Sequence, residues 1–126
     1  MLLWPFDGCL DELLKAGNIV IVETYPAECY RWFFENGLKG KGKLEVRKQA
    51  APALLNWVLS AKVTLDPKLK RAIEAGFTDG EDDAFDATVG LFGMLEVLLN
   101  RRKSGEPNDE SVRKLEGWIL GQESGS

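Results

Sequence analysis

Apolar residues recur along most of the chain at spacings typical of amphipathic helices, and one short segment departs from this pattern. Leu10, Leu13 and Leu14 lie on one side of a short predicted helix that ends at Gly17. Residues 19–23 instead begin with the run Ile-Val-Ile-Val, which lacks polar alternation and is typical of a strand covered on both faces. The pattern therefore predicts a mostly α-helical fold with one core β-strand.

Proline, glycine and capping residues mark the other predicted helices. Pro26 follows the strand closely and suits the first turn of a helix. Thr78 and Glu81, three residues apart, have the spacing of a capping box at the start of the longest helix. We expect residues 118–120 to fold back onto the core and residues 121–126 to form a frayed tail. The predicted helices cover residues 26–35, 47–60, 66–75, 78–101 and 109–115.

A single buried strand raises the question of what pairs with its backbone. Both edges of residues 19–23 carry N–H and C=O groups that need hydrogen-bond partners. Two sources are open at this point: a second copy of the chain, or sequence that this chain lacks. The first alternative predicts a homo-oligomer that forms through Ile19–Glu23.

Composition narrows the class of protein. The 126 residues suit a single domain, residues 1–126, and 44% hydrophobic with 29% charged residues is typical of a water-soluble globular protein. The net charge of −4 argues against binding of nucleic acid through overall charge, although a local basic patch is compatible with it. The chain has no histidine, which excludes Ser-His-Asp and Cys-His catalysis and the usual imidazole metal ligands.

The cysteines and the apolar segments bear on localisation. Cys9 and Cys29 form neither a CxxC pair nor a disulfide framework, and we expect both to be buried thiols in a reducing compartment. Residues 1–7 carry no basic leader and are interrupted by a proline and an acid, unlike a signal peptide. The apolar runs are far shorter than the roughly 20 residues that span a bilayer. These features predict a cytoplasmic protein without a membrane anchor.

Acidic residues gather around the start of the longest predicted helix. Asp83 and Asp86 lie three positions apart on one face, which continues through Gly90 and Gly93. Acids in a first helical turn also complement the helix dipole without any further function. Because a glycine costs about 1 kcal/mol in a helix, however, we expect another backbone to pass close to this face, with the acids at its rim. Asp82 points partly away and is the weaker candidate.

Glu23 supplies a third carboxylate at the end of the predicted strand. In open α/β sheets, ligands and catalytic groups collect at the carboxyl ends of the strands. Together with Asp83 and Asp86, Glu23 would form an oxygen-rich site suited to Mg²⁺ or Mn²⁺, the ions that support phosphodiester cleavage. An acid that simply leaves a buried strand for solvent explains Glu23 equally well. Glu23, Asp83 and Asp86 are the candidate catalytic and metal-binding residues.

Basic residues are concentrated in one glycine-containing loop, residues 39–48, with the single acid Glu45. Its glycines lack the spacing of a phosphate-binding loop. A solvated flexible turn explains this composition, and a contact with phosphates is the functional alternative, which makes nucleic acid a candidate partner. The candidate nucleic-acid-binding residues are Lys39, Lys41, Lys43, Arg47 and Lys48.

Four segments carry a resemblance to a known family. They are Trp4-Pro5-Phe6-Asp7-Gly8, Val22-Glu23-Thr24-Tyr25-Pro26-Ala27-Glu28, Asp82-Asp83-Ala84-Phe85-Asp86-Ala87 with Gly90-Leu91, and Glu116-Gly117-Trp118-Ile119. In this order they resemble the family catalogued as domain of unknown function 429, which is similar to the ribonuclease-H-like nucleases. The resemblance implies that Glu23 is the acid of the fourth strand and that Asp83 and Asp86 are the metal-binding pair of the last helix.

The resemblance covers only the C-terminal half of such a domain. Family members carry three further strands, and an acid on the first of them, ahead of the Trp-Pro-Phe-Asp-Gly segment. The expected fold is thus an α/β fragment of a ribonuclease-H-like domain that lacks the first three strands. The expected function is that of a metal-dependent nuclease, a hydrolase by resemblance only, which is incomplete and inactive by itself. The alternatives are a non-catalytic oligomerising or interaction module, and a separate chain that supplies the other half.

Overall fold

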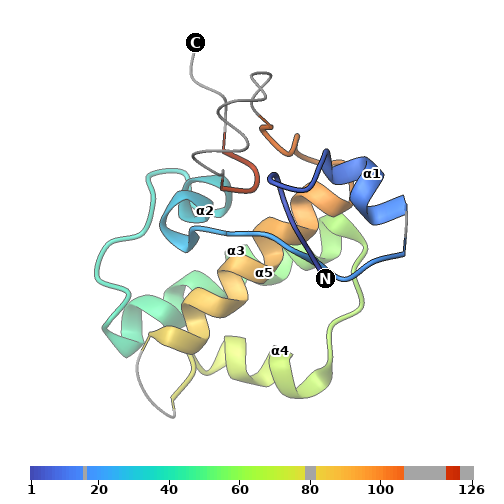
Figure 1. Ribbon diagram of the computed structural model, residues 1–126. Helices are drawn as coiled ribbons and strands as arrows, with labels where there is room; N and C mark the ends of the chain where they lie inside the picture. Colours follow the sequence, from blue (N-terminus) through green and yellow to red (C-terminus); the bar gives the residue numbers. More distant parts are fainter. Residues whose placement is uncertain (16, 79–81, 107–118, 123–126) are drawn as a thin grey trace. The chain divides into compact units, whose positions relative to one another are not determined.

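The computed structural model describes residues 1–15, 17–78, 82–106 and 119–122 (Figure 1). Within them the protein is mostly helical, as expected, with five helices and one two-stranded parallel sheet. The elements are β1 (Leu2–Leu3), α1 (Leu10–Lys15), β2 (Val20–Ile21), α2 (Pro26–Phe33), α3 (Leu44–Ala61), α4 (Pro67–Glu74) and α5 (Asp83–Leu98). No helix among these residues combines the length and the apolar character needed to cross a bilayer.

The chain divides into two compact units, which are described separately. The first unit comprises residues 1–25 and 94–126, and the second comprises residues 26–93. The boundary falls inside α5, so the N-terminal part of that helix belongs to the second unit and its C-terminal end to the first.

In the first unit the predicted strand pairs with another segment of the same chain. β1 pairs with β2 in parallel, with Leu2 opposite Val20 and Leu3 opposite Ile21. The Leu2 N–H donates to the Ile19 carbonyl at 2.9 Å, and the Trp4 N–H donates to the Ile21 carbonyl at 3.0 Å. The expectation that the partner must come from outside this chain was therefore wrong. A two-residue strand is too short to produce a recognisable alternation of apolar positions.

The end of the strand is paired as well. Glu23 forms a parallel bridge with Ile119, and the Leu120 N–H donates to the Glu23 carbonyl at 2.9 Å. Residues 119–120 thus fold back as expected. Gly121 is buried and the Gln122 N–H donates to the Ile119 carbonyl at 3.2 Å, so the expected fraying does not begin at residue 121. Other expectations fall outside the described residues: Glu81 of the capping box, the helix at 109–115, Trp118 and the tail at 123–126.

Only one face of the strand is covered. Val20 and Val22 pack against the core of the first unit, whereas Ile19 and Ile21 are 73% and 42% exposed. Successive side chains of a strand point to opposite faces, so the two pairs lie on opposite sides of the sheet. The expectation of a strand buried on both faces was wrong, because an unbroken apolar run does not reveal which face has a neighbour. The core consists of Trp4, Leu10, Leu13, Val97 and Leu120.

In the second unit the helix boundaries follow local signals. Pro26 occupies the first position of α2, and the Asp66 carboxylate caps α4 by accepting from the Lys68 N–H at 2.8 Å. Both starts were predicted. α3 begins at Leu44, earlier than the predicted Arg47, because the charged residues that follow Gly42 in the predicted loop are helix formers.

Aromatic side chains form much of the core of the second unit. Trp57 stacks on Phe92 with ring centroids 4.6 Å apart, and Phe33 packs edge-on against Trp57 at 5.7 Å. Tyr30 lies beside Phe85 at 6.0 Å. Helix α3 also packs against α2 and α4. Stacked and edge-on pairs of this kind add to the stabilisation by apolar burial alone.

Gly93 allows α2 to approach α5 closely. A Cβ at this position would lie 2.5 Å from the Cys29 Sγ and 3.0 Å from the Trp32 ring. A close approach on this face of the helix is therefore confirmed at Gly93, but the expectation that a backbone makes it was wrong, because the neighbouring atoms belong to side chains. Cys29 is buried, as expected, whereas Cys9 is only partly buried.

Gly93→Ala is expected to lower the free energy of unfolding. Overpacking of a filled core costs roughly 1–3 kcal/mol, whereas the gain in helix propensity is at most about 1 kcal/mol. Urea denaturation followed by circular dichroism measures the change. Gly42→Ala is the matched control, since a Cβ at Gly42 meets nothing within 4 Å.

The double variant Gly93→Ala with Cys29→Ala tests the cause, because it removes the sulfur atom that the new methyl group would meet. We expect it to lose less stability than the sum of the two single variants. A Gly93→Ala chain as stable as the wild type would contradict the close contact.

Candidate functional site

The ammonium group of Lys41 lies between two carboxylates at the start of α5. Its Nζ is 2.9 Å from Asp82 Oδ2 and 2.5 Å from Asp86 Oδ2. The same ammonium lies over the Tyr30 ring, 5.7 Å from its centroid. All three charged side chains are partly buried. We call Lys41, Asp82, Asp86 and Tyr30 the Lys41 cluster.

Helical spacing brings the two carboxylates of the cluster together. Asp82 immediately precedes α5, and Asp86 lies four positions later, where side chains share a helix face. The Asp86 N–H donates to the Asp82 carbonyl at 2.9 Å, which continues the helical hydrogen bonding back to Asp82. Both side chains can therefore contact one group on the adjacent loop.

A buried arginine holds the loop that carries Lys41. Arg47 is 3% exposed, and its Nη1 donates to the Lys41 carbonyl at 2.8 Å. Its Nε donates to the Gly76 carbonyl at 2.7 Å, which joins the loop to the end of α4. Arg47 was predicted to bind nucleic acid. Burial and these two hydrogen bonds make it a positioning residue for Lys41 instead.

The other residues of the predicted basic loop differ in their surroundings. Lys39, Lys43 and Lys48 are exposed, and Lys48 forms an ion pair with Glu45 at 3.9 Å. Lys41 is turned toward the carboxylates. Three of the five candidate nucleic-acid-binding residues are thus exposed. The other two, Lys41 and Arg47, form contacts that hold the loop against the rest of the second unit.

The predicted carboxylates are distributed over both units. Glu23 is exposed and belongs to the first unit, whereas Asp83 and Asp86 belong to the second. Asp83 is exposed, and the structure pairs Asp86 with Asp82 around Lys41. Within the described ranges, no three acidic or cysteine side chains form a metal-binding group. The joint site of Glu23, Asp83 and Asp86 stays a prediction.

Sequence reasoning gave too little weight to Asp82. The three-residue spacing of Asp83 and Asp86 drew attention to that pair, although the four-residue spacing of Asp82 and Asp86 places two side chains on one face equally well. Lys41 was considered only for binding to phosphates. The position of Lys41 beside the acids depends on the hydrogen bond from Arg47 to the Lys41 carbonyl, which no local pattern in the sequence reveals.

The two carboxylates have opposite pKa shifts. The hydrogen bond from Lys41 holds the pKa of Asp82 below its ordinary value, whereas burial raises the pKa of Asp86. The Asp86 Oδ1 is buried and has no hydrogen-bond partner among the described residues. Asp86 therefore carries one oxygen that contacts the ammonium and one whose desolvation is not compensated.

Comparisons with known proteins add no assignment. No protein-family model matches the chain, and searches among curated proteins and among solved structures find no match either. The resemblance of the four sequence segments to the family named above stays a prediction.

Asp82→Asn is expected to remove a stabilisation that depends on pH. Because the folded-state pKa of Asp82 is lowered from 3.8, ionised Asp82 stabilises the fold above that pH, and this contribution is lost as the pH falls through the lower folded value. The wild type should exceed Asp82→Asn in free energy of unfolding between about pH 5 and 7, and the difference should shrink below about pH 4.

Urea denaturation at a series of pH values measures this difference. Asp83→Asn is the matched control, because it removes an exposed carboxylate from the same helical turn without removing a contact to Lys41. Asp86 has the opposite effect on the pH dependence. Because its folded-state pKa is raised from 3.8, its ionisation at higher pH lowers the stability of the fold. A difference between wild type and Asp82→Asn that does not change with pH would contradict the prediction.

Proposed function

We propose that the chain is a nuclease-like domain of ribonuclease-H-like type, which binds a divalent cation, Mg²⁺ or Mn²⁺, through the carboxylates at the start of α5. The single observation that carries this proposal is the convergence of Asp82 Oδ2 and Asp86 Oδ2 on one positive charge, the Lys41 ammonium. The four sequence segments that resemble a nuclease-like family support it independently. Glu23 and Asp83 remain the predicted additional ligands.

The residues of the Lys41 cluster fit such an ion. Mg²⁺ prefers carboxylate oxygens and is usually held by one or two carboxylates together with water. The Asp86 Oδ1 is a buried acceptor without a partner among the described residues, so it can take a ligand without breaking an existing bond. The Lys41 ammonium and a divalent cation would share the same two Oδ2 atoms, which makes them alternative partners of the cluster.

The chain's own residues then have distinct roles. Asp82 and Asp86 would hold the ion, which in such sites activates water and stabilises the charge that develops on a phosphodiester. Arg47 would keep the loop attached through its two hydrogen bonds to backbone carbonyls when the Lys41 ammonium is released. Lys39 and Lys43 on the same loop are exposed, and in this proposal they would contact phosphate oxygens.

One observation favours a non-catalytic interaction module instead. Lys41 already neutralises charge at both carboxylates, and an ion pair of this kind also serves to tie a loop to a helix. In this alternative the Lys41 cluster is structural, and no divalent cation binds.

Mn²⁺ binding separates the two functions. Lys41→Gln is expected to bind Mn²⁺ about tenfold more tightly than the wild type, because the competing ammonium is gone. Asp82→Asn and Asp86→Asn should weaken binding in both backgrounds. Electron paramagnetic resonance of free Mn²⁺ measures the binding. Glu74→Gln, which removes an exposed acid from α4, is the control.

Absence of Mn²⁺ binding by both the wild type and Lys41→Gln at millimolar concentrations would overturn the proposal in favour of the interaction module. Binding that survives Asp86→Asn would place the ion elsewhere and would contradict the assignment to the Lys41 cluster.

A cleavage assay tests whether the chain acts alone. The resemblance implies an incomplete nuclease, and among the described residues two carboxylates meet in the Lys41 cluster. Counting only the described residues, we therefore expect labelled DNA and RNA oligonucleotides with Mn²⁺ to be cleaved no faster by the wild type than by Asp86→Asn. Metal-dependent cleavage by the wild type that both Asp86→Asn and Glu23→Gln abolish would show a complete enzyme and would contradict this expectation.

A further inference from the structure

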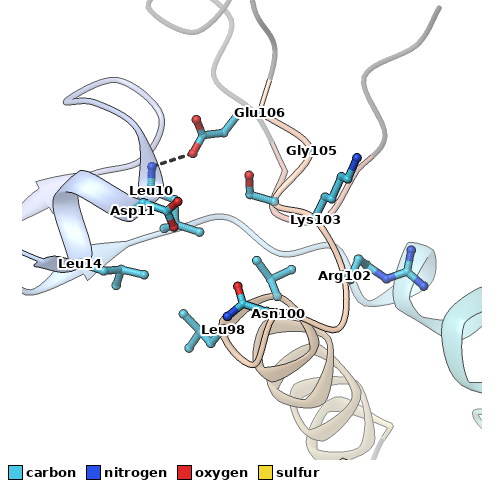
Figure 2. Close-up of a pocket in the computed structure, with 11 residues that line it drawn as sticks. Leu10, Asp11, Leu14, Leu98, Asn100, Arg102, Lys103, Gly105 and Glu106 are labelled. Carbon is cyan, nitrogen blue, oxygen red and sulfur yellow. Dashed lines mark hydrogen bonds between the residues drawn. The ribbon is translucent and has the colours of Figure 1, made fainter.

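A cavity of about 500 Å³ opens in the first unit. Side chains of α1 form one wall, and the C-terminal end of α5 with the segment up to Glu106 forms the other (Figure 2). Cavities of a few hundred Å³ suit a small organic ligand. The volume therefore admits a molecule with a short carbon chain.

Leucine side chains provide an apolar surface inside this cavity. Leu10 and Val97 belong to the buried core, while Leu14 and Leu98 are both 42% exposed. Leu14 and Leu98 come from different elements and point toward the same space in Figure 2. An aliphatic group in the cavity would cover both leucines, and burial of apolar area contributes roughly 25 cal/mol per Å².

The polar groups that face the same space both offer an acceptor oxygen. In Figure 2 the Asp11 carboxylate and the Asn100 amide point into the space between α1 and α5. Asp11 is exposed and has no hydrogen bond or ion pair with the described residues. Arg102 and Lys103 also line the cavity, but their charged ends point away from α1 in the same view.

Acids and bases both line the cavity, but around Asp11 and the end of α5 the negative charge favours a cation, since the charged ends of Arg102 and Lys103 point away from α1. The C-terminal end of a helix carries a partial negative charge, and Asn100, just after α5, sits at this end. Asp11 adds a full negative charge. The Glu106 carboxylate on the opposite wall is already engaged, since its Oε1 accepts from the Trp4 Nε1 at 2.8 Å and from the Leu10 N–H at 2.6 Å.

The wall formed by the segment after α5 is held in place before any ligand binds. Gly105 has a φ of +77°, and a Cβ there would overlap the Gln122 carbonyl. The Gly121 N–H donates to the Ser104 carbonyl at 2.7 Å. A preformed wall lowers the entropic cost of binding a small molecule.

We propose that this cavity binds a small aliphatic primary amine in its ammonium form. The ammonium donates to the Asp11 carboxylate and to the Asn100 side-chain oxygen, and the carbon chain lies on Leu14 and Leu98. The site lies in a different unit from the Lys41 cluster and does not depend on the proposed nuclease-like function.

Titration of the isotope-labelled chain with n-hexylamine tests the proposal. At pH 7 we expect saturable shifts of the backbone amide signals of Leu14, Leu98 and Asn100. Asp11→Asn should weaken binding about three- to tenfold, because the ammonium loses its charged partner. Glu12→Gln is the matched control, since Glu12 is an exposed acid on the same helix that does not line the cavity.

Two further six-carbon ligands show whether the cavity recognises the ammonium group or the carbon chain. Hexanoate should bind more weakly than the amine, and hexanol should bind with no dependence on Asp11. Equal or tighter binding of hexanoate would overturn the proposal in favour of an anion site. An absence of saturable shifts, or an equal effect of Asp11→Asn and Glu12→Gln, would also overturn it.

Discussion

Burial of a single guanidinium group is the constraint on which the second unit's candidate site depends. A buried charge is tolerated only when its donors are paired, and Arg47 meets this requirement through the carbonyls of Lys41 and Gly76. The two hydrogen bonds join a loop that follows α2 to Gly76, which lies just after the C-cap of α4. The position of the Lys41 ammonium between Asp82 and Asp86 follows from this tie.

The Lys41 cluster joins two opposing electrostatic effects. Ammonium contact favours the ionised form of Asp82, while desolvation disfavours the ionised form of Asp86. Perturbed carboxylates of this kind occur both in structural ion pairs and at functional sites. The Asp86 Oδ1 has no hydrogen-bond partner in the part of the chain that the structure describes. This oxygen distinguishes the cluster from a fully satisfied ion pair, and it is the reason for considering a divalent cation.

The first unit is held together by backbone pairing of its strands and by hydrogen bonds of Glu106, one of them at the start of α1. β1, β2 and residues 119–120 satisfy backbone groups along residues 19–23, while Val20 and Val22 cover the core. The same unit uses the side chain of Glu106 to hold both Trp4 and the first residue of α1. These ties give the cavity beside α1 its walls and leave Leu14 and Leu98 uncovered inside it.

The sequence by itself determined the helical character, the presence of a strand within residues 19–23 and the starts of α2 and α4, because apolar spacing, proline and capping residues act locally. It also identified Gly93 as a point of close approach. Only the tertiary structure decided that Leu2–Leu3 pairs with the strand, that Arg47 is buried and that Asp82 shares Lys41 with Asp86. Each of these depends on contacts between segments distant along the chain, for which the sequence carries no local pattern.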